Sequence, residues 1–277
     1  MASLLALGGA LSWGVGDFLG GIASRRIAVV TVLAISQAAG LAGLLVVVWI
    51  ARDPFPGVIE LAPAAAAGAA GLIGLGALYR GFAVGAMGIV APISGAAPLV
   101  PLAVDAAQGV VPGTSQWFGI ALVLAGIGAL SLEPATGERR VAAGAGLAVV
   151  AALGFGFFIV GIDAGADESA SWAVVAARAA SVTIAVVAAL AVTRSSLRPP
   201  RNLLLVLVGV GAFDTGANVL VAFATTKGAA GPVAVLSALY PVVTIVLARI
   251  VLAERLTTAK RAGGMVALGG AALVAAG

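Results

Sequence analysis

Ten apolar segments take up most of the chain, and the polar connections between them are too short for a domain outside a membrane. The segments span residues 2–22, 28–51, 62–84, 88–108, 115–133, 141–163, 170–193, 202–225, 230–252 and 258–276. Crossing a hydrocarbon layer of ~30 Å takes about 20 helical residues, which the first segment provides, although several of the ten are short or rich in Gly and Pro. Because a backbone in lipid must pair its own hydrogen-bonding groups, helices are favoured over open strands. The sequence predicts an all-α polytopic membrane protein with ten transmembrane helices.

Composition excludes several classes of protein. Charged residues make up 9% of the chain, against about 25% in ordinary soluble domains, and the mean hydropathy is +1.18. The absence of cysteine and histidine excludes disulfides, Cys/His metal sites and catalytic triads that need histidine. No basic face with interleaved aromatics suggests nucleic-acid binding, and no phosphate-binding loop suggests ATP hydrolysis. We therefore expect no metal, no cofactor and no nucleic-acid partner, but a lipid bilayer around the chain.

Positive charge is distributed unevenly between the two sets of loops. Connections after odd-numbered segments carry Arg25, Arg26, Arg80, Arg139, Arg140, Arg194, Arg198, Arg201, Arg255, Lys260 and Arg261, whereas those after even-numbered segments carry Arg52 and Lys227. Basic loops stay in the cytoplasm. The bias predicts a multi-pass protein of the cell (inner) membrane with both termini on the non-cytoplasmic side. Residues 2–22 lack a basic leader and are interpreted as the first transmembrane helix, not as a signal peptide.

The two halves of the chain repeat one another. "WGVGDFLGGI" (Trp13–Ile22) aligns without a gap to "LGFGFFIVGI" (Leu153–Ile162), which pairs Asp17 with Phe157. "ISGAAPLVPLAV" (Ile93–Val104) aligns to "LSALYPVVTIVL" (Leu236–Leu247). Residues 1–137 and 138–277 then form two five-helix repeats within one membrane domain. Five is an odd number, so the second repeat enters the membrane from the opposite side, and such inverted repeats are typical of secondary transporters with a midplane site.

A family resemblance is visible in four stretches. They are "SWG" at 12–14, Ser94–Pro98, Ser237–Pro241 and "LAERLT" (Leu252–Thr257). In these the chain resembles the ten-helix, EamA-type branch of the drug/metabolite transporter superfamily. The resemblance implies a central cavity with the seventh segment outside it, export of amino acids or small metabolites, and a monomer that functions alone.

Two carboxylates inside predicted spans are the first candidates for the site. A charge in a span costs about 2.5–3.5 kcal/mol on insertion scales and therefore points to function. Asp17 either meets a substrate ammonium or a coupling proton, or lines a hydrated vestibule or caps a neighbouring helix. Asp214, one turn before Asn218 in "FDTGAN", either lines the cavity or belongs to a buried structural network.

Uncharged and other charged residues complete the set. A wall with aromatic rings and hydroxyl donors is predicted from Trp13, Tyr79, Ser94, Ser237 and Tyr240, with ordinary packing or an interface belt as the alternative for Trp13 and Tyr79. Prolines inside the fourth and ninth segments predict broken backbone ladders and hinges. Arg178 is expected to anchor the structure, by pairing with Asp163 or Asp167 or by extending to the interface. Asp105 is expected at the interface.

Four functions are compatible with these residues. The first is a secondary exporter of amino acids or related metabolites that works by alternating access, with or without proton coupling. The second is a proton-coupled exporter of drug-like or other cationic molecules. An intramembrane aspartyl enzyme built on Asp17 and Asp214 is a remote third, and we expect no enzyme. The fourth, a scaffold, requires a dry and evenly packed centre.

Overall fold

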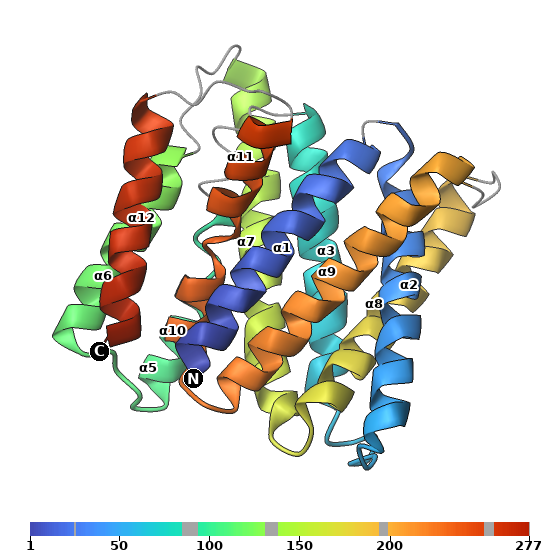
Figure 1. The fold of residues 1–277 in the computed structure, drawn as a ribbon, viewed down its shortest axis with the longest axis horizontal. Coiled ribbons are helices and arrows are strands. Elements are labelled where there is room, and N and C mark those ends of the chain that lie inside the picture. The colour runs from blue at the N-terminus through green and yellow to red at the C-terminus, as the bar shows by residue number, and fades with distance from the viewer. Residues whose placement is uncertain (25, 85–93, 131–137, 194–198, 252–257, 277) are drawn as a thin grey trace.

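The structure is a computed structural model that describes residues 1–276 apart from 25, 85–93, 131–137, 194–198 and 252–257. The described helices pack side by side as a bundle (Figure 1). They are α1 (Ala2–Ser24), α2 (Val29–Ala51), α3 (Ala62–Val84), α5 (Leu99–Ala107), α6 (Thr114–Leu130), α7 (Glu138–Ala166), α8 (Ala170–Thr193), α9 (Arg201–Thr225), α10 (Ala230–Ser237), α11 (Tyr240–Val251) and α12 (Thr258–Ala276). The all-α prediction is confirmed, because no strand occurs in the described part of the chain.

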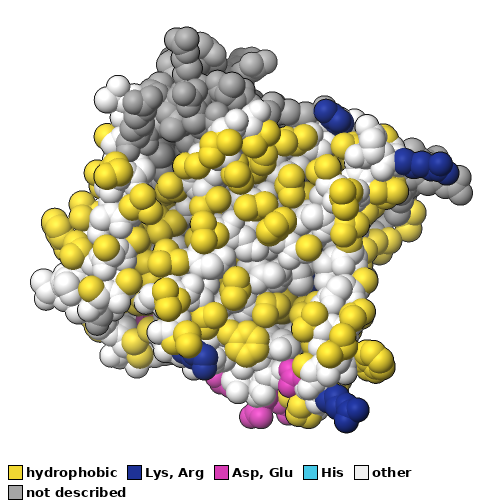
Figure 2. Space-filling view, in the orientation of Figure 1, with side chains coloured by type: hydrophobic (Ala, Val, Ile, Leu, Met, Phe, Trp, Pro, Cys, Tyr) yellow, Lys and Arg dark blue, Asp and Glu magenta, His cyan; other side chains and the backbone are white. Residues whose placement is uncertain are grey.

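Length and composition identify the bundle as a multi-pass membrane protein. Within the described residues, five helices are long and apolar enough to cross a membrane: α1, α2, the stretch 146–166 of α7, the stretch 170–191 of α8, and α9. Shorter apolar helices cover 62–78, 114–129, 230–244 and 262–276. Figure 2 shows apolar side chains across the face of the bundle, with charged side chains gathered toward its two ends. That distribution fits a hydrocarbon layer around the middle and water at both ends.

The fourth and ninth predicted segments are both interrupted near their middle. Residues 95–98 form a turn before α5 begins at Leu99, and α10 ends at Ser237 before α11 begins at Tyr240. Pro98 is the N-cap of α5, and Pro241 is the second residue of α11. A proline is tolerated at a helix start because its missing N–H would have no intrahelical partner there. The predicted breaks at these two prolines are confirmed.

Helix packing shows a two-fold relation between the halves. The pair α1–α9 has α7–α3 as its counterpart, and α2–α9 has α8–α3. The pairs α2–α8 and α6–α12 each join a helix to its own counterpart in the other repeat, and α5–α10 joins the second half of the broken fourth segment to the first half of the broken ninth. In Figure 1, α1 begins at the end of the bundle where α12 finishes, whereas α7 begins at the opposite end. The two repeats are therefore inverted, as the sequence predicts.

Glycine contacts place the two first helices in a different register from the sequence alignment. A Cβ added to Gly14 would lie 2.8 Å from the carbonyl oxygen of Tyr240, and one added to Gly156 would lie 2.8 Å from that of Ala97. The alignment of the broken segments pairs Ala97 with Tyr240. Gly14 is therefore the structural counterpart of Gly156, whereas the gapless sequence alignment pairs Gly14 with Gly154.

This shift corrects the residue that stands opposite Asp17. Its counterpart is Ile159, which is 5% exposed, and not Phe157, which is 54% exposed on the outer surface. The sequence pairing was wrong because both first helices carry several glycines two residues apart, so two registers match almost equally well. An isoleucine thus occupies the position of the aspartate in the second repeat.

Candidate functional site

A central cavity of about 100 Å³ lies where the two repeats meet. Its lining includes side chains from α1, α2, α3, α7, α8 and α9, together with residues at both helix breaks. This is the volume open to the centres of water molecules, and one water needs roughly 10–15 Å³ of it. The cavity therefore has room for several waters. The dry centre that a scaffold requires is not what the described residues form.

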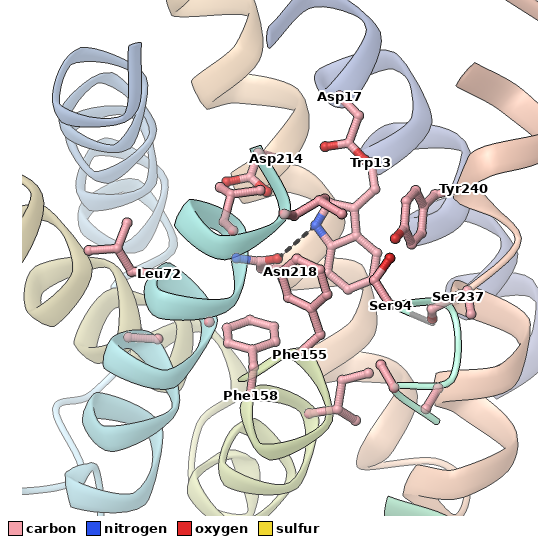
Figure 3. Close-up of a pocket in the computed structure, with 18 of the residues that line it drawn as sticks. Trp13, Asp17, Leu72, Ser94, Phe155, Phe158, Asp214, Asn218, Ser237 and Tyr240 are labelled. Carbon is pink, nitrogen blue, oxygen red and sulfur yellow. Dashed lines mark hydrogen bonds between the residues drawn. The ribbon is translucent and has the colours of Figure 1, made fainter. Parts of the chain in front are cut away.

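Seven of the eight predicted site residues line this one cavity. They are Trp13, Asp17, Ser94, Asp214, Asn218, Ser237 and Tyr240, and most of them are visible around the opening in Figure 3. Tyr79 belongs to α3, but its side chain lies outside the described part of the structure. The residues are brought together from four separate regions of the sequence. A role for each of them in binding substrate stays a prediction.

Arg178 forms an ion pair with Asp214 at the cavity wall. Its Nη2 lies 2.5 Å from Oδ2 of Asp214, and its Nη1 donates a hydrogen bond to Oε1 of Gln37. Gln37 in turn donates from Nε2 to Oδ2 of Asp214 at 3.3 Å, and Ser181 Oγ donates to Oε1 of Gln37 at 2.9 Å. Both Arg178 and Gln37 are only 4% exposed. Four polar side chains therefore form one network that joins α2, α8 and α9, in which the buried Nε of Arg178 has no hydrogen-bond partner among the described residues.

The expectations for Arg178 are corrected by this network. Its partner is neither Asp163 nor Asp167, and α8 does contribute to the cavity lining. The reason is that α8 packs against both α2 and α9, so a side chain one third of the way along α8 faces inward toward them. Arg178 does anchor the structure as predicted, but it does so at the cavity.

Sequence reasoning missed Gln37 and Ser181. A signal for Gln37 was present, because Gln37 lies eight residues after Val29, where α2 begins, and Arg178 lies eight residues after Ala170, where α8 begins. The two residues hold equivalent positions in the two repeats, and α2 and α8 contact each other. Equivalent positions on two counterpart helices that cross at a two-fold axis come close together. Polar residues at equivalent positions of the two repeats can therefore be recognised in the sequence as a candidate contact pair.

An aromatic corner lies beside the network. Trp13 Nε1 donates a hydrogen bond to Oδ1 of Asn218 at 3.0 Å, and the Trp13 and Tyr240 rings meet edge to face with centroids 6.5 Å apart. In Figure 3 the hydroxyl groups of Tyr240 and Ser94 point toward one another. The indole of Trp13 is thus held in the cavity and does not belong to an interface belt. Asp17 lies one helical turn beyond Trp13.

Asp17 differs from Asp214 in its partners. Among the described residues, Arg178–Asp214 is the only salt bridge, and no hydrogen bond reaches the Asp17 carboxylate. Asp17 is half-buried and lines the cavity. If all three charged groups are ionised, the cavity carries one excess negative charge, and that charge sits on Asp17.

The opposite wall is apolar. It is formed by Leu72 and Leu75 of α3 and by Phe155, Phe158 and Ile159 of α7. Figure 3 shows Phe155 and Phe158 on the far side of the opening from Asp17 and Asp214. The cavity therefore presents charged and hydrogen-bonding groups on one side and hydrocarbon on the other, an arrangement suited to an amphipathic molecule.

Asp105, which is expected at the interface, lies near the end of α5 at one end of the bundle, and its side chain is buried within the protein. It is 6% exposed, and its Oδ2 accepts a hydrogen bond at 2.7 Å from the backbone N–H of Gly231 in the first turn of α10. The first amides of a helix have no intrahelical acceptor and favour a negative charge. The carboxylate therefore caps the first half of a broken helix, and it links the two repeats at the end of the bundle where both termini lie (Figure 1).

Comparisons with known proteins agree with this architecture. The model of a family described as the EamA-like transporter family matches residues 1–132 and, a second time, residues 142–276. A solved crystal structure, described only as that of a protein, is similar over 98% of this chain and 95% of its own, with 19% sequence identity and a TM-score of 0.76. That level of identity supports a shared fold alone. No curated protein sequence matches the chain.

Proposed function

The chain belongs to the EamA-like transporter family and is thus a membrane transporter of the drug/metabolite transporter superfamily, and from this premise we propose that it is a secondary exporter of small metabolites. The observation that carries the proposal is the central cavity between inverted repeats, with a charged side and an apolar side. Transporters with inverted repeats bind their substrate at such a midplane site and expose it alternately to the two faces of the membrane.

The substrate class proposed is an amine-bearing metabolite such as an amino acid. Asp17 supplies a negative charge for an ammonium group, and Trp13 and Tyr240 supply aromatic surface next to it. The phenylalanines and leucines across the cavity suit an apolar body. Drug-like cations share the same chemistry and are the second candidate. In either case one chain provides both repeats around the site, so we propose a functional monomer in the cell (inner) membrane with both termini outside the cytoplasm.

An aspartyl enzyme is disfavoured by the partners of Asp214. Two catalytic carboxylates of this kind share one proton because they lie too close for both to ionise. Asp214 is paired with Arg178 instead, and no hydrogen bond joins Asp214 to Asp17 among the described residues. The arginine contacts an oxygen of Asp214, so the two aspartates lack the mutual hydrogen bond of a dyad.

Flux measurements on reconstituted protein test the proposal. Purified protein in liposomes is loaded with unlabelled amino acid or amine, and uptake of the labelled compound is followed with and without a pH gradient. Transport predicts accumulation above that of protein-free liposomes. Flux that a gradient leaves unchanged argues against proton coupling. If no member of a broad panel of amines and amino acids crosses faster than it does in protein-free liposomes, the proposal is wrong.

A further inference from the structure

The structure assigns the cation-binding role in the central cavity to Asp17 alone, and we propose that the substrate is an organic monocation with an apolar body, bound in preference to a zwitterion of the same shape. This inference rests on the proposed transport function, since it names the substrate class of the same cavity. It also separates the two candidates left open above, because an amino acid is a zwitterion and a cationic amine is not.

The first step concerns which carboxylate is free. Asp214 shares Oδ2 between the Arg178 guanidinium at 2.5 Å and the Gln37 amide at 3.3 Å. Separating this pair would leave a nearly buried guanidinium without a counter-ion, which is strongly unfavourable. A substrate ammonium therefore gains little at Asp214. Asp17 has no salt bridge in the described structure, so an ammonium there displaces no cationic side chain.

The second step concerns the surroundings of Asp17. Trp13 lies one turn earlier on α1, and Tyr240 meets it edge to face. Aromatic faces attract organic cations, more strongly when water is excluded. The hydrogen bond from Trp13 to Asn218 fixes the indole in place before a ligand arrives. A carboxylate beside two oriented rings is the chemistry that recognises an ammonium or alkylammonium group.

The third step concerns a substrate carboxylate. The only cation at the cavity, within the described residues, is Arg178. Its Nη1 is bound to Gln37, its Nη2 faces Asp214, and its Nε and Nη2 atoms have almost no exposed surface. A zwitterion would bring a carboxylate into the cavity with no accessible cation to pair it. Burying an unpaired charge is costly, so the zwitterion binds more weakly than the amine.

The fourth step concerns the rest of the molecule. Leu72, Leu75 and Phe155 line the cavity, and Figure 3 shows Phe155 on the far side of the opening from Asp17 and Asp214. An apolar body placed there is removed from water, which is favourable in proportion to the apolar surface buried. The ligand that satisfies both sides has its positive charge at one end and hydrocarbon at the other.

Three probes with one phenylethyl body test the charge preference on wild-type protein. Phenethylamine is a cation, phenylalanine a zwitterion and 3-phenylpropionate an anion. Isothermal titration of each into purified protein is expected to give an affinity for the amine at least about tenfold above that for the amino acid, the size of one unpaired polar group, and no detectable binding of the anion. Equal affinities for amine and amino acid, or tighter binding of phenylalanine, overturn the inference without any variant.

Variants then locate the charge. Asp17→Asn is expected to lower phenethylamine affinity about tenfold or more, and Asp17→Glu to restore most of it. Asp167→Asn removes an exposed acid remote from the cavity and serves as the matched control. The double variant Arg178→Gln/Asp214→Asn removes the ion pair as a unit and should keep the preference for amine over amino acid. If that preference disappears in the double variant but survives in Asp17→Asn, Asp214 is the binding group and the assignment is wrong.

Flux measured on the same preparations separates the two proposals. Asp17-dependent binding of the amine without flux of any probe supports the monocation site and refutes the transport function. Flux of phenylalanine that persists in Asp17→Asn, without any preference for the amine, supports transport and refutes the monocation site.

Discussion

The indole Nε1 of Trp13 donates a hydrogen bond to Oδ1 of Asn218 at 3.0 Å, and this single bond joins the first helix of one repeat to the third helix of the other. It lies at the junction of the aromatic corner and the polar network, so it bears on both the shape and the stability of the cavity. The predictions below concern this bond and the other contacts that hold the repeats together.

The Trp13–Asn218 bond should be measurable as a coupling energy. Asn218→Leu leaves a partly buried indole N–H without its acceptor, and Trp13→Phe removes the donor. Double-mutant cycles on hydrogen bonds between membrane helices average about 0.6 kcal/mol and reach about 1.7 kcal/mol. We expect a value in that range from denaturant unfolding of the two single variants and the double variant. Strictly additive effects would mean that the bond contributes nothing to stability.

Removing one member of the Arg178–Asp214 pair should be worse than removing both. Arg178→Gln leaves the Asp214 carboxylate unpaired and is expected to destabilise the fold by about 3–5 kcal/mol. Arg178→Gln/Asp214→Asn removes both charges and should recover most of that loss. Unfolding midpoints of the wild type and the two variants provide the comparison. A double variant less stable than Arg178→Gln would contradict the pairing.

Gly14 should tolerate no side chain. A Cβ there would meet the Tyr240 carbonyl and the side chain of Val243, so Gly14→Ala must push α1 away from α11. We expect a loss of roughly 1–3 kcal/mol, typical of overpacking. Gly21→Ala in the same helix is the matched control, because a Cβ there has nothing within 4 Å. The melting temperatures of the two variants in thermal unfolding test this expectation. Similar values for Gly14→Ala and Gly21→Ala would count against the close approach of α1 and α11.

Labelling with a membrane-impermeant thiol reagent tests the topology. The chain has no cysteine, so each introduced cysteine gives a unique signal. Ser3→Cys and Ala275→Cys lie at the end of the bundle that holds both termini. Asn202→Cys lies in the first turn of α9, at the other end. We expect the first two to be labelled from outside intact cells and the third only after the cells are opened. Labelling of Ser3 and Ala275 from different sides would refute the inverted repeat.

Fold class and helix positions could be read from the sequence because they depend on local patterns. Apolar runs set the spans, and the prolines at 98 and 241 marked the breaks. The cavity residues were also accessible, since acids and amides inside apolar segments are costly unless they face a polar space. Contacts between helices could not be predicted in this way. The partner of Arg178 depends on which helix packs against α8, and the sequence pattern of α8 alone does not contain that information.

Register was the other feature beyond the reach of sequence. One repeat has glycines at 14 and 16 and the other at 154 and 156, so an alignment by residue identity alone paired Asp17 with Phe157, which lies on the outer surface. The contact of Gly14 with the Tyr240 carbonyl settled the register, because only one glycine of each pair lies against a broken helix.

The placement of Asp17 opposite Ile159 has a thermodynamic consequence for the transport cycle. A duplicated protein with identical halves would have two end states of equal energy, one open to each compartment. Here the acid, the amide and the ion pair lie toward α1 and α9, and hydrocarbon lies toward α3 and α7. In the alternating-access cycle that we propose, the two end states of the empty carrier are expected to differ in energy, and substrate is expected to bind with unequal apparent affinity from the two compartments.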